Sequence, residues 1–124
     1  MLGDIDALPI VAVSDIGRAR HFYESVLGLP LQDDHGEVLV FRTGATALVV
    51  YRSDEAGSNR GNAVVWACGE QIDAIVDDLR SKDVHFEHYP QLGLEWRDGV
   101  HWAGDKKLVW INDPDNNILH LHSM

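Results

Sequence analysis

Residues 8–16 read Leu-Pro-Ile-Val-Ala-Val-Ser-Asp-Ile, and this stretch decides how the chain begins to fold. The apolar run over residues 8–13 predicts a short buried strand. Ser14 and Asp15, which follow it, are of the type that caps a helix. From residue 16 to residue 27 apolar side chains recur at helical spacing, so we expect an amphipathic helix directly after the strand.

Two β-rich segments and a linker follow the first helix, and the same order of patterns then begins again. Residues 37–43 and 46–52 are rich in β-forming residues and are joined by Gly44-Ala45, which predicts a hairpin. The polar, glycine-bearing segment 53–61 has the composition of a linker. After it come an expected strand at 63–68, a helical stripe opened by Ile72, and expected strands at 84–89, 108–111 and 118–122. Ile16 and Ile72 open the two stripes, so the repeat has a period of about 56 residues.

Length and charge narrow the class of protein. A chain of 124 residues is the size of one domain. Its net charge of −10 repels a phosphate backbone, so we expect no nucleic-acid partner. No apolar run approaches the length of a membrane span, and the N-terminus lacks the pattern of a secretion signal. We therefore expect a cytoplasmic protein without a membrane partner.

Local chemistry predicts the conformation of two loop residues. Asp113-Pro114-Asp115-Asn116-Asn117 links the last two expected strands, and Asn116 is suited to a positive φ there. Asp83 follows the second helix at a place where glycine would be favoured, which predicts a slightly strained or frayed end. The lone cysteine, Cys68, is expected to be a small buried side chain rather than a nucleophile.

The segment 90–105 fits no expected element and carries Trp96, His101 and Trp102. A long loop rich in aromatic residues is typical of a lid or the wall of a binding site. The alternative is a loop that packs against its own domain or a dimer partner.

Two longer motifs resemble those of the vicinal oxygen chelate superfamily, which includes glyoxalase I, bleomycin-resistance proteins, fosfomycin-resistance enzymes and extradiol dioxygenases. They are His-Phe-Tyr-Glu-Ser-Val-Leu-Gly-Leu at 21–29 and the closing Asp-Pro-Asp-Asn-Asn-Ile-Leu at 113–119. The resemblance implies an α+β fold of two βαβββ modules, at about 7–52 and 62–123, whose curved mixed sheets form a cup. It also implies a homodimer.

Enzymes of this superfamily hold a divalent metal through four strand residues, and this chain departs from that set. The first ligand position falls on Leu8, the strand at 46–51 has no carboxylate, and the strand at 62–66 has no His or Gln. Only His120, at the usual glutamate position, could bind a metal. We therefore expect neither the usual metal centre nor any other cofactor.

His120 is the strongest candidate for a functional side chain. It alternates with Leu119 and Leu121, so His120 and His122 share one face of the expected strand. By the resemblance that face looks into the cup, where His120 would be a hydrogen-bonding group or general base, with His101 able to approach it. The alternatives are a satisfied cup residue and, less simply, a metal held by these three histidines. The remaining histidines have no arrangement that singles them out: His21, His35, His85 and His88.

Four tryptophans provide flat surfaces for stacking on planar ligands. Trp66 and Trp110 lie on expected strands, and Trp96 and Trp102 on the long segment. The first two are equally compatible with plain core positions, and the second two with plain packing.

The sequence therefore favours a small-molecule-binding protein of the glyoxalase and bleomycin-resistance type. Its ligand would be planar or apolar and would meet aromatic and imidazole side chains: Trp66, Trp96, His101, Trp102, Trp110, His120 and His122. One alternative is a lyase, isomerase or dioxygenase-like enzyme that uses His120 as a catalytic residue, with or without a divalent metal. Another is a structural or regulatory dimer with a vestigial cup.

Overall fold

The repeated pattern corresponds to two compact units in a computed structural model that describes all 124 residues. The first unit comprises Met1–Asn59 and the second Arg60–Met124, so their boundary falls within the polar segment 53–61. Each unit contains one mixed β-sheet, of four strands in the first and five in the second, together with short helices. The fold is therefore α+β, as expected.

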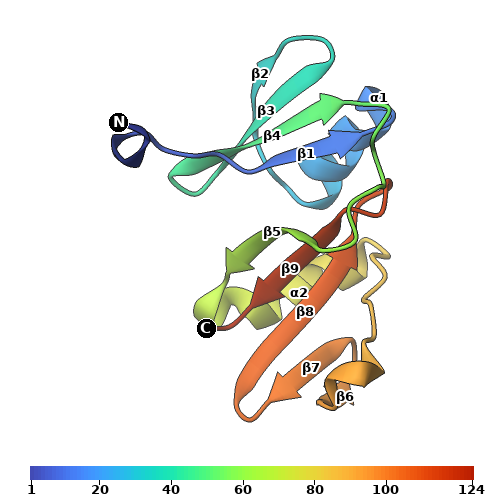
Figure 1. Cartoon of the computed structure of the whole chain (residues 1–124). Coiled ribbons are helices and arrows are strands. Elements are labelled where there is room, and N and C mark those ends of the chain that lie inside the picture. Colours follow the sequence, from blue (N-terminus) through green and yellow to red (C-terminus); the bar gives the residue numbers. More distant parts are fainter. The chain divides into compact units, whose positions relative to one another are not determined.

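The sheet of the first unit has the strand order β1-β4-β3-β2 (Figure 1). Its strands are β1 (Ile10–Val13), β2 (Leu31–Asp34), β3 (Val38–Thr43) and β4 (Thr46–Arg52). β1 runs parallel to β4, and the predicted hairpin joins β3 to β4 through the Thr43–Thr46 pair. The sequence pattern did not reveal β2, because its four residues are mostly polar.

The predicted first helix is present, and it changes from an α-helix to a π-helix along its length. A short turn, η1 (Leu2–Asp4), precedes β1, and α1 (Ile16–Arg20) follows it. The side chain of Asp15 caps α1 by accepting a 2.9 Å hydrogen bond from the Arg18 N–H. The helix then continues as a π-helical segment, η2 (His21–Val26), which places Phe22 and Tyr23 in the core of this unit.

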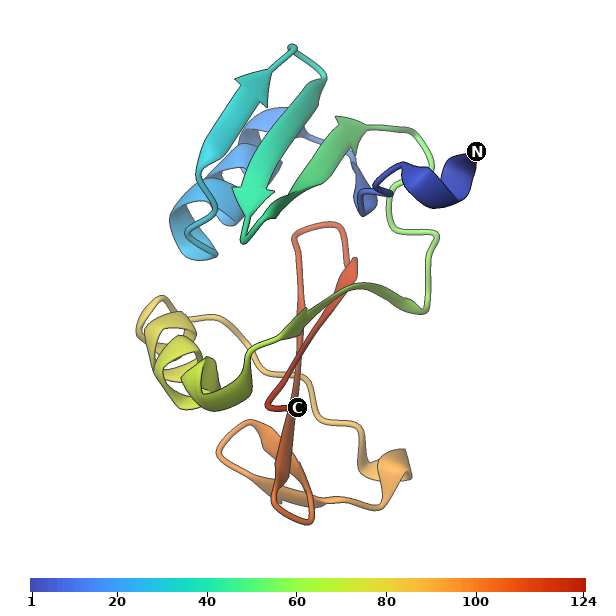
Figure 2. The ribbon, with the colours of Figure 1, turned by 90° about the vertical axis from the view of Figure 1, so that its left-hand side faces the viewer.

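The sheet of the second unit has the order β5-β9-β8-β7-β6. Its strands are β5 (Asn62–Ala67), β6 (Glu95–Arg97), β7 (Val100–Ala103), β8 (Lys106–Asn112) and β9 (Ile118–His122). β5 is parallel to β9, and the remaining neighbours are antiparallel. The turn η3 (Gly69–Gln71) precedes the helix α2 (Ile72–Ser81). Both Figure 1 and Figure 2 show that α2 lies against one face of this sheet.

α2 has the amphipathic pattern that the sequence predicts. Its buried side chains are Ile72, Val76 and Leu79, which recur at helical spacing. The chain leaves the helix through Asp83, whose φ of 61° is the left-handed conformation expected for this position.

Two expectations for the next part of the chain are wrong. Residues 84–89 do not form a strand, although the Glu87 N–H donates to the Trp110 carbonyl of β8. The segment 90–105 is not a free loop, because it contains a short turn, η4 (Pro90–Leu92), and the hairpin of β6 and β7. Asp98 and Gly99 close this hairpin with φ values of 52° and 84°. An Asp-Gly pair between β-forming residues is a strong hairpin signal, and it could have identified these strands.

The turn between β8 and β9 is held by a buried carboxylate. Asp113 is 3% exposed and accepts hydrogen bonds from the backbone N–H groups of Asp115 and Asn117, at 2.9 and 2.8 Å. It also accepts one from the Asn117 side-chain amide at 2.8 Å. Asn116 has a φ of 64°, which confirms the expectation for this turn.

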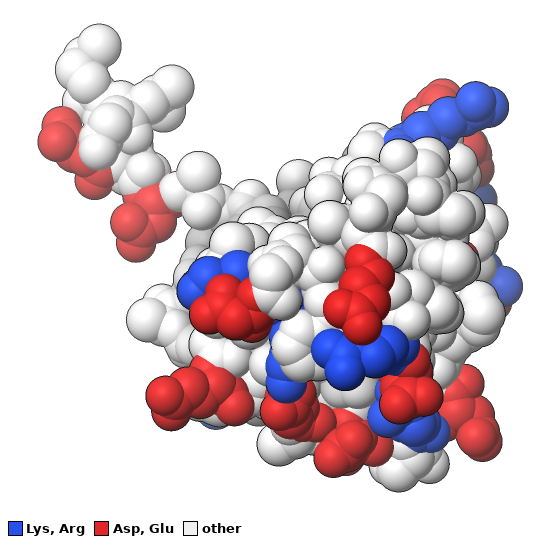
Figure 3. Space-filling model, turned by 90° about the horizontal axis from the view of Figure 1, so that it is seen from below, with Lys and Arg blue, Asp and Glu red and all other residues white.

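Charged side chains of both signs occupy the face seen in Figure 3, where basic groups lie among acidic ones. Four ion pairs lie within the second unit: Lys107 with Asp73, Arg80 with Asp77, Lys82 with Asp78 and Arg97 with Glu95. No helix of the chain is long and apolar enough to span a membrane.

Candidate functional site

The two faces of the second sheet differ in chemistry. Lys107 of β8 forms a 2.5 Å ion pair with Asp73 of α2, so this side of β8 faces the helix. Since side chains alternate along a strand, Val109 lies on the same side as Lys107, and its partner Leu121 with it. His120 and His122 therefore lie on the face opposite α2, as the alternation in the sequence predicts.

Seven rings contact one another in series on this opposite face and along its border. We call them the ring row: Trp96, His88, His101, Tyr89, Trp110, His120 and His122. Trp110 stacks on His120 with 4.4 Å between ring centroids and 17° between planes. His120 and His122 are 5.5 Å apart, and His101 meets Trp110 edge to face at 5.0 Å. The row offers flat surface and imidazole nitrogens together.

Trp110 anchors the centre of the row. Its side chain is 9% exposed, and its indole N–H donates a 3.2 Å hydrogen bond to Oδ1 of Asn62 on β5. This bond satisfies the one polar group of the indole, so the ring is held in place against His120.

His120 has a defined protonation state. Its Nδ1 lies 3.0 Å from the Val109 carbonyl oxygen, which can only accept a hydrogen bond, so Nδ1 carries the proton. Desolvation by burial lowers the pKa of His120, and the neighbouring His122 lowers it further, against the opposing effect of the Val109 bond. The ring is therefore neutral at pH 7, with an unprotonated Nε2.

His101 is fully buried, at 0% exposure, at the middle of the row. Its Nε2 accepts a 2.9 Å hydrogen bond from the Tyr89 N–H, and no hydrogen-bond partner of good geometry meets its Nδ1. Desolvation lowers its pKa, with a smaller contribution from His88 and an opposing one from the Leu108 backbone. His101 thus joins segment 84–89 to β7, and its burial keeps Nδ1 away from a ligand.

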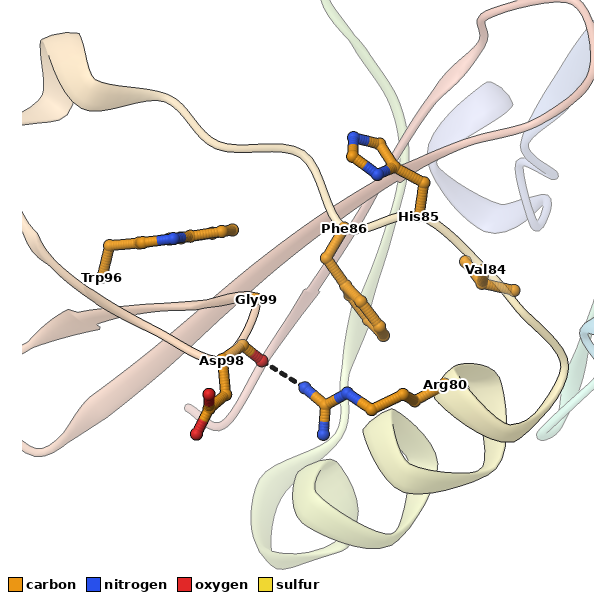
Figure 4. Close-up of a pocket in the computed structure, with 7 residues that line it drawn as sticks. All are labelled: Arg80, Val84, His85, Phe86, Trp96, Asp98 and Gly99. Carbon is orange, nitrogen blue, oxygen red and sulfur yellow. Dashed lines mark hydrogen bonds between the residues drawn. The ribbon is translucent and has the colours of Figure 1, made fainter.

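A second feature of this unit is an open pocket of about 500 Å³, shown in Figure 4. It is lined by Arg80, Val84, His85, Phe86, Trp96, Asp98 and Gly99. The Arg80 guanidinium donates to the Asp98 carbonyl oxygen and lies 5.4 Å from the centre of the Phe86 ring. Its charge is thus already engaged in holding the turn of the β6–β7 hairpin against α2, and the pocket shares only Trp96 with the ring row.

Comparison with known proteins decides the family. The model of the glyoxalase-like domain matches residues 7–124, which is nearly the whole chain. The chain belongs to this family. It is a member of the vicinal oxygen chelate superfamily, as the two sequence motifs indicate.

Individual relatives agree with this assignment. The uncharacterized protein YraH of Bacillus subtilis strain 168 is 25% identical over 126 residues, covering 90% of this chain and 92% of YraH. The fosfomycin resistance protein FosX of Listeria monocytogenes superposes with a TM-score of 0.71 at 14% identity, covering 94% of this chain and 90% of FosX. A glyoxalase/bleomycin resistance protein/dioxygenase of Alicyclobacillus acidocaldarius gives 0.69 at 18% identity, with coverages of 94% and 90%. At these identities the solved structures establish the fold alone.

The side chains of this glyoxalase-like domain do not match the metal set of the superfamily's enzymes. No group of three or more His, Cys, Asp or Glu side chains is arranged to hold a metal ion. His120 and His122 are neighbours, but His101 has its Nε2 engaged by Tyr89. These side chains therefore do not fit a metal centre.

Five of the seven expected ligand-binding residues lie together in the ring row, and two do not. Trp66 pairs with Leu121 in the sheet and so lies on the α2 face. Trp102 pairs with Lys107 on that same face, where Arg97 and Lys107 lie 4.4 and 4.8 Å from its ring. These cation–π contacts give Trp102 a packing role in the described structure.

Three residues of the site were not found from the sequence. His88 stacks on Trp96 with 4.3 Å between centroids, Tyr89 contacts Trp110 at 5.2 Å, and Asn62 holds the Trp110 indole. His88 and Tyr89 belong to a segment whose path depends on long-range contacts, so no local pattern distinguishes them.

Cys68 behaves as a structural residue. Burial raises the pKa of its thiol, which therefore stays protonated at pH 7, and its Sγ lies 3.6 Å from the Trp66 carbonyl oxygen. This environment does not favour a nucleophile.

Proposed function

We propose that this protein binds a small planar or apolar molecule against the ring row, without the usual metal of its superfamily. A cytoplasmic homodimer is part of this proposal, on the strength of the family resemblance. The observation that carries the proposal is the stack of Trp110 on His120, continued by His122, on the sheet face opposite α2.

Several features of the row favour binding. Indole and imidazole rings stack on planar molecules at little entropic cost, because few side-chain torsions must be fixed. The Asn62 and Val109 hydrogen bonds hold Trp110 and His120 in place before a ligand arrives. Preorganisation of this kind raises affinity by reducing what must be ordered on binding.

Tryptophan fluorescence tests this proposal with a matched pair of variants. A panel of planar aromatic compounds is titrated into the wild type, Trp110→Phe and Trp102→Phe. We expect at least one compound to quench the wild type and Trp102→Phe, and most of the quenching to disappear in Trp110→Phe. If no compound quenches, or if the two variants respond alike, the ring row is not a binding surface.

A second candidate function, catalysis, is favoured by the state of His120. A neutral imidazole with its Nδ1–H held by a carbonyl and its Nε2 unprotonated has the form of a general base. Turnover of a hemithioacetal, an epoxide or a catechol is the relevant assay. If the wild type turns over one of these and His120→Gln loses about a hundredfold or more in rate while binding is kept, the enzyme function replaces the binding function.

A further inference from the structure

Backbone hydrogen bonds favour opposite tautomers in His120 and His122. The Val109 carbonyl accepts from Nδ1 of His120, which leaves Nε2 of that ring as a hydrogen-bond acceptor. In His122 the direction is reversed, because its Nδ1 accepts a 3.2 Å hydrogen bond from the Met124 N–H. With Nδ1 as the acceptor of this bond, the proton of the ring is on Nε2, which becomes a donor.

The two rings are neighbours on one strand and on one face of it. Their centroids are 5.5 Å apart with 51° between the planes, so the two rings are close enough for one ligand to reach both. His120 is in addition stacked on the Trp110 indole, so one face of this polar pair is already covered by an aromatic ring.

We propose that the ligand of this face is a neutral, planar molecule that carries a hydrogen-bond donor next to an acceptor on one edge, a fused-ring lactam being the simplest case. This inference rests on the proposed binding function and specifies its ligand class. The ligand's N–H would donate to Nε2 of His120, and its carbonyl oxygen would accept from Nε2 of His122.

The same pair disfavours the other common class of small polar ligand. A carboxylate or phosphate group only accepts hydrogen bonds, so it would leave Nε2 of His120 facing an acceptor. Protonation of His120 would remove this mismatch, but burial of that ring opposes its protonation. The chain's net charge of −10 also repels anions over longer distances.

Three bicyclic aromatic probes separate these possibilities at pH 8. They are 2-quinolone, which has the donor and the acceptor, N-methyl-2-quinolone, in which the donor is blocked, and 2-naphthoate, which only accepts. We expect 2-quinolone to bind about tenfold more tightly than its N-methyl analogue, since one hydrogen bond is lost and an acceptor is left unpaired, and 2-naphthoate to bind most weakly. Dissociation constants from fluorescence or NMR titration measure this order.

Variants locate the effect on the ring pair. His120→Phe keeps a ring for stacking on Trp110 but removes the acceptor, so it is expected to bind the two quinolones equally. His122→Phe removes the donor and is expected to weaken both by a similar factor. His35→Phe, a change of an exposed histidine in the first unit, is the control and should retain the wild-type preference.

The tautomers themselves can be read in the wild type by long-range ¹H–¹⁵N NMR of labelled histidine, which does not depend on any variant folding. The proposal requires Nδ1–H for His120 and Nε2–H for His122, and the opposite assignment for either ring overturns it. Equal binding of the two quinolones to the wild type also overturns it but leaves the proposed function standing. If none of the three probes binds, the proposed ligand class is wrong, and the compound panel with Trp110→Phe and Trp102→Phe decides separately whether the ring row binds a ligand.

Discussion

His101 shows what the packing of the second unit does to a single imidazole. Four rings surround it, those of Trp96, Trp110, Tyr89 and His88, and none of its surface is exposed. Desolvation lowers its pKa in the folded state below the value of about 6.5 for an unfolded histidine. Below that pH the unfolded chain binds a proton that the folded chain excludes. The contribution of His101 to the free energy of unfolding is therefore fully present above about pH 6.5 and declines as the pH falls.

Replacing His101 should reduce this acid sensitivity. The free energy of unfolding of the wild type is expected to fall between pH 7.5 and pH 5.5, by at most about 1.4 kcal/mol per pH unit for this one proton. In His101→Phe the ring is retained and the proton is lost, so the decline should be smaller, although the Tyr89 N–H loses its acceptor and the overall stability drops. Urea titrations at the two pH values measure both effects. His35→Phe should behave as the wild type, and an unchanged pH dependence in His101→Phe would contradict the argument.

At the scale of an element, the turn of the β6–β7 hairpin is fixed by backbone conformation and by close packing. Gly99 has a φ of 84°, which a side chain rarely tolerates. A Cβ at this position would also lie 2.9 Å from the Cβ and Cγ of Phe86, which is itself 9% exposed. The turn of the next hairpin offers a comparison, since Gly104 has a φ of 65° with open space around it.

Two alanine substitutions separate the backbone cost from the packing cost. Gly104→Ala should destabilise the protein by about 1 kcal/mol through its left-handed conformation alone. Gly99→Ala should cost about 1–3 kcal/mol more, because Phe86 must move. Thermal and urea unfolding measure the difference. Equal costs would show that Phe86 moves aside freely, and that the contact does not fix the hairpin.

At the scale of the whole molecule, the side chains available as metal ligands determine whether the protein binds a metal ion. Neither unit brings three metal-binding side chains together, and the expected first ligand position is occupied by Leu8. A single imidazole holds a metal ion weakly against water, and a bound metal would stabilise the folded state.

The purified protein is therefore expected to contain no stoichiometric transition metal, and EDTA should leave its melting temperature unchanged. Elemental analysis and differential scanning fluorimetry are the measurements. A metal-to-protein ratio near one that is lost in His120→Ala would contradict this prediction and support the catalytic alternative.

The sequence by itself determined the features that depend on neighbours along the chain. Periodicity and turn chemistry act over a few residues. They predict the helices that begin after Asp15 and at Ile72, the β3–β4 hairpin and the left-handed conformation of Asp83 and Asn116. The common face of His120 and His122 follows in the same way, from the two-residue repeat of a strand.

Only the tertiary structure decided what those residues meet. The strand order β5-β9-β8-β7-β6 brings residues distant in sequence together. It determines the path of residues 84–89, the contact of His88 with Trp96 and the position of Trp102 on the α2 face. The tautomers of His120 and His122 depend on which backbone groups the folded chain brings to each ring. The pattern of side chains along a strand determines which face of the sheet a residue occupies. The residues that it contacts there are determined by how the strands assemble, because the free energy of these contacts is gained only when segments distant in sequence pack together.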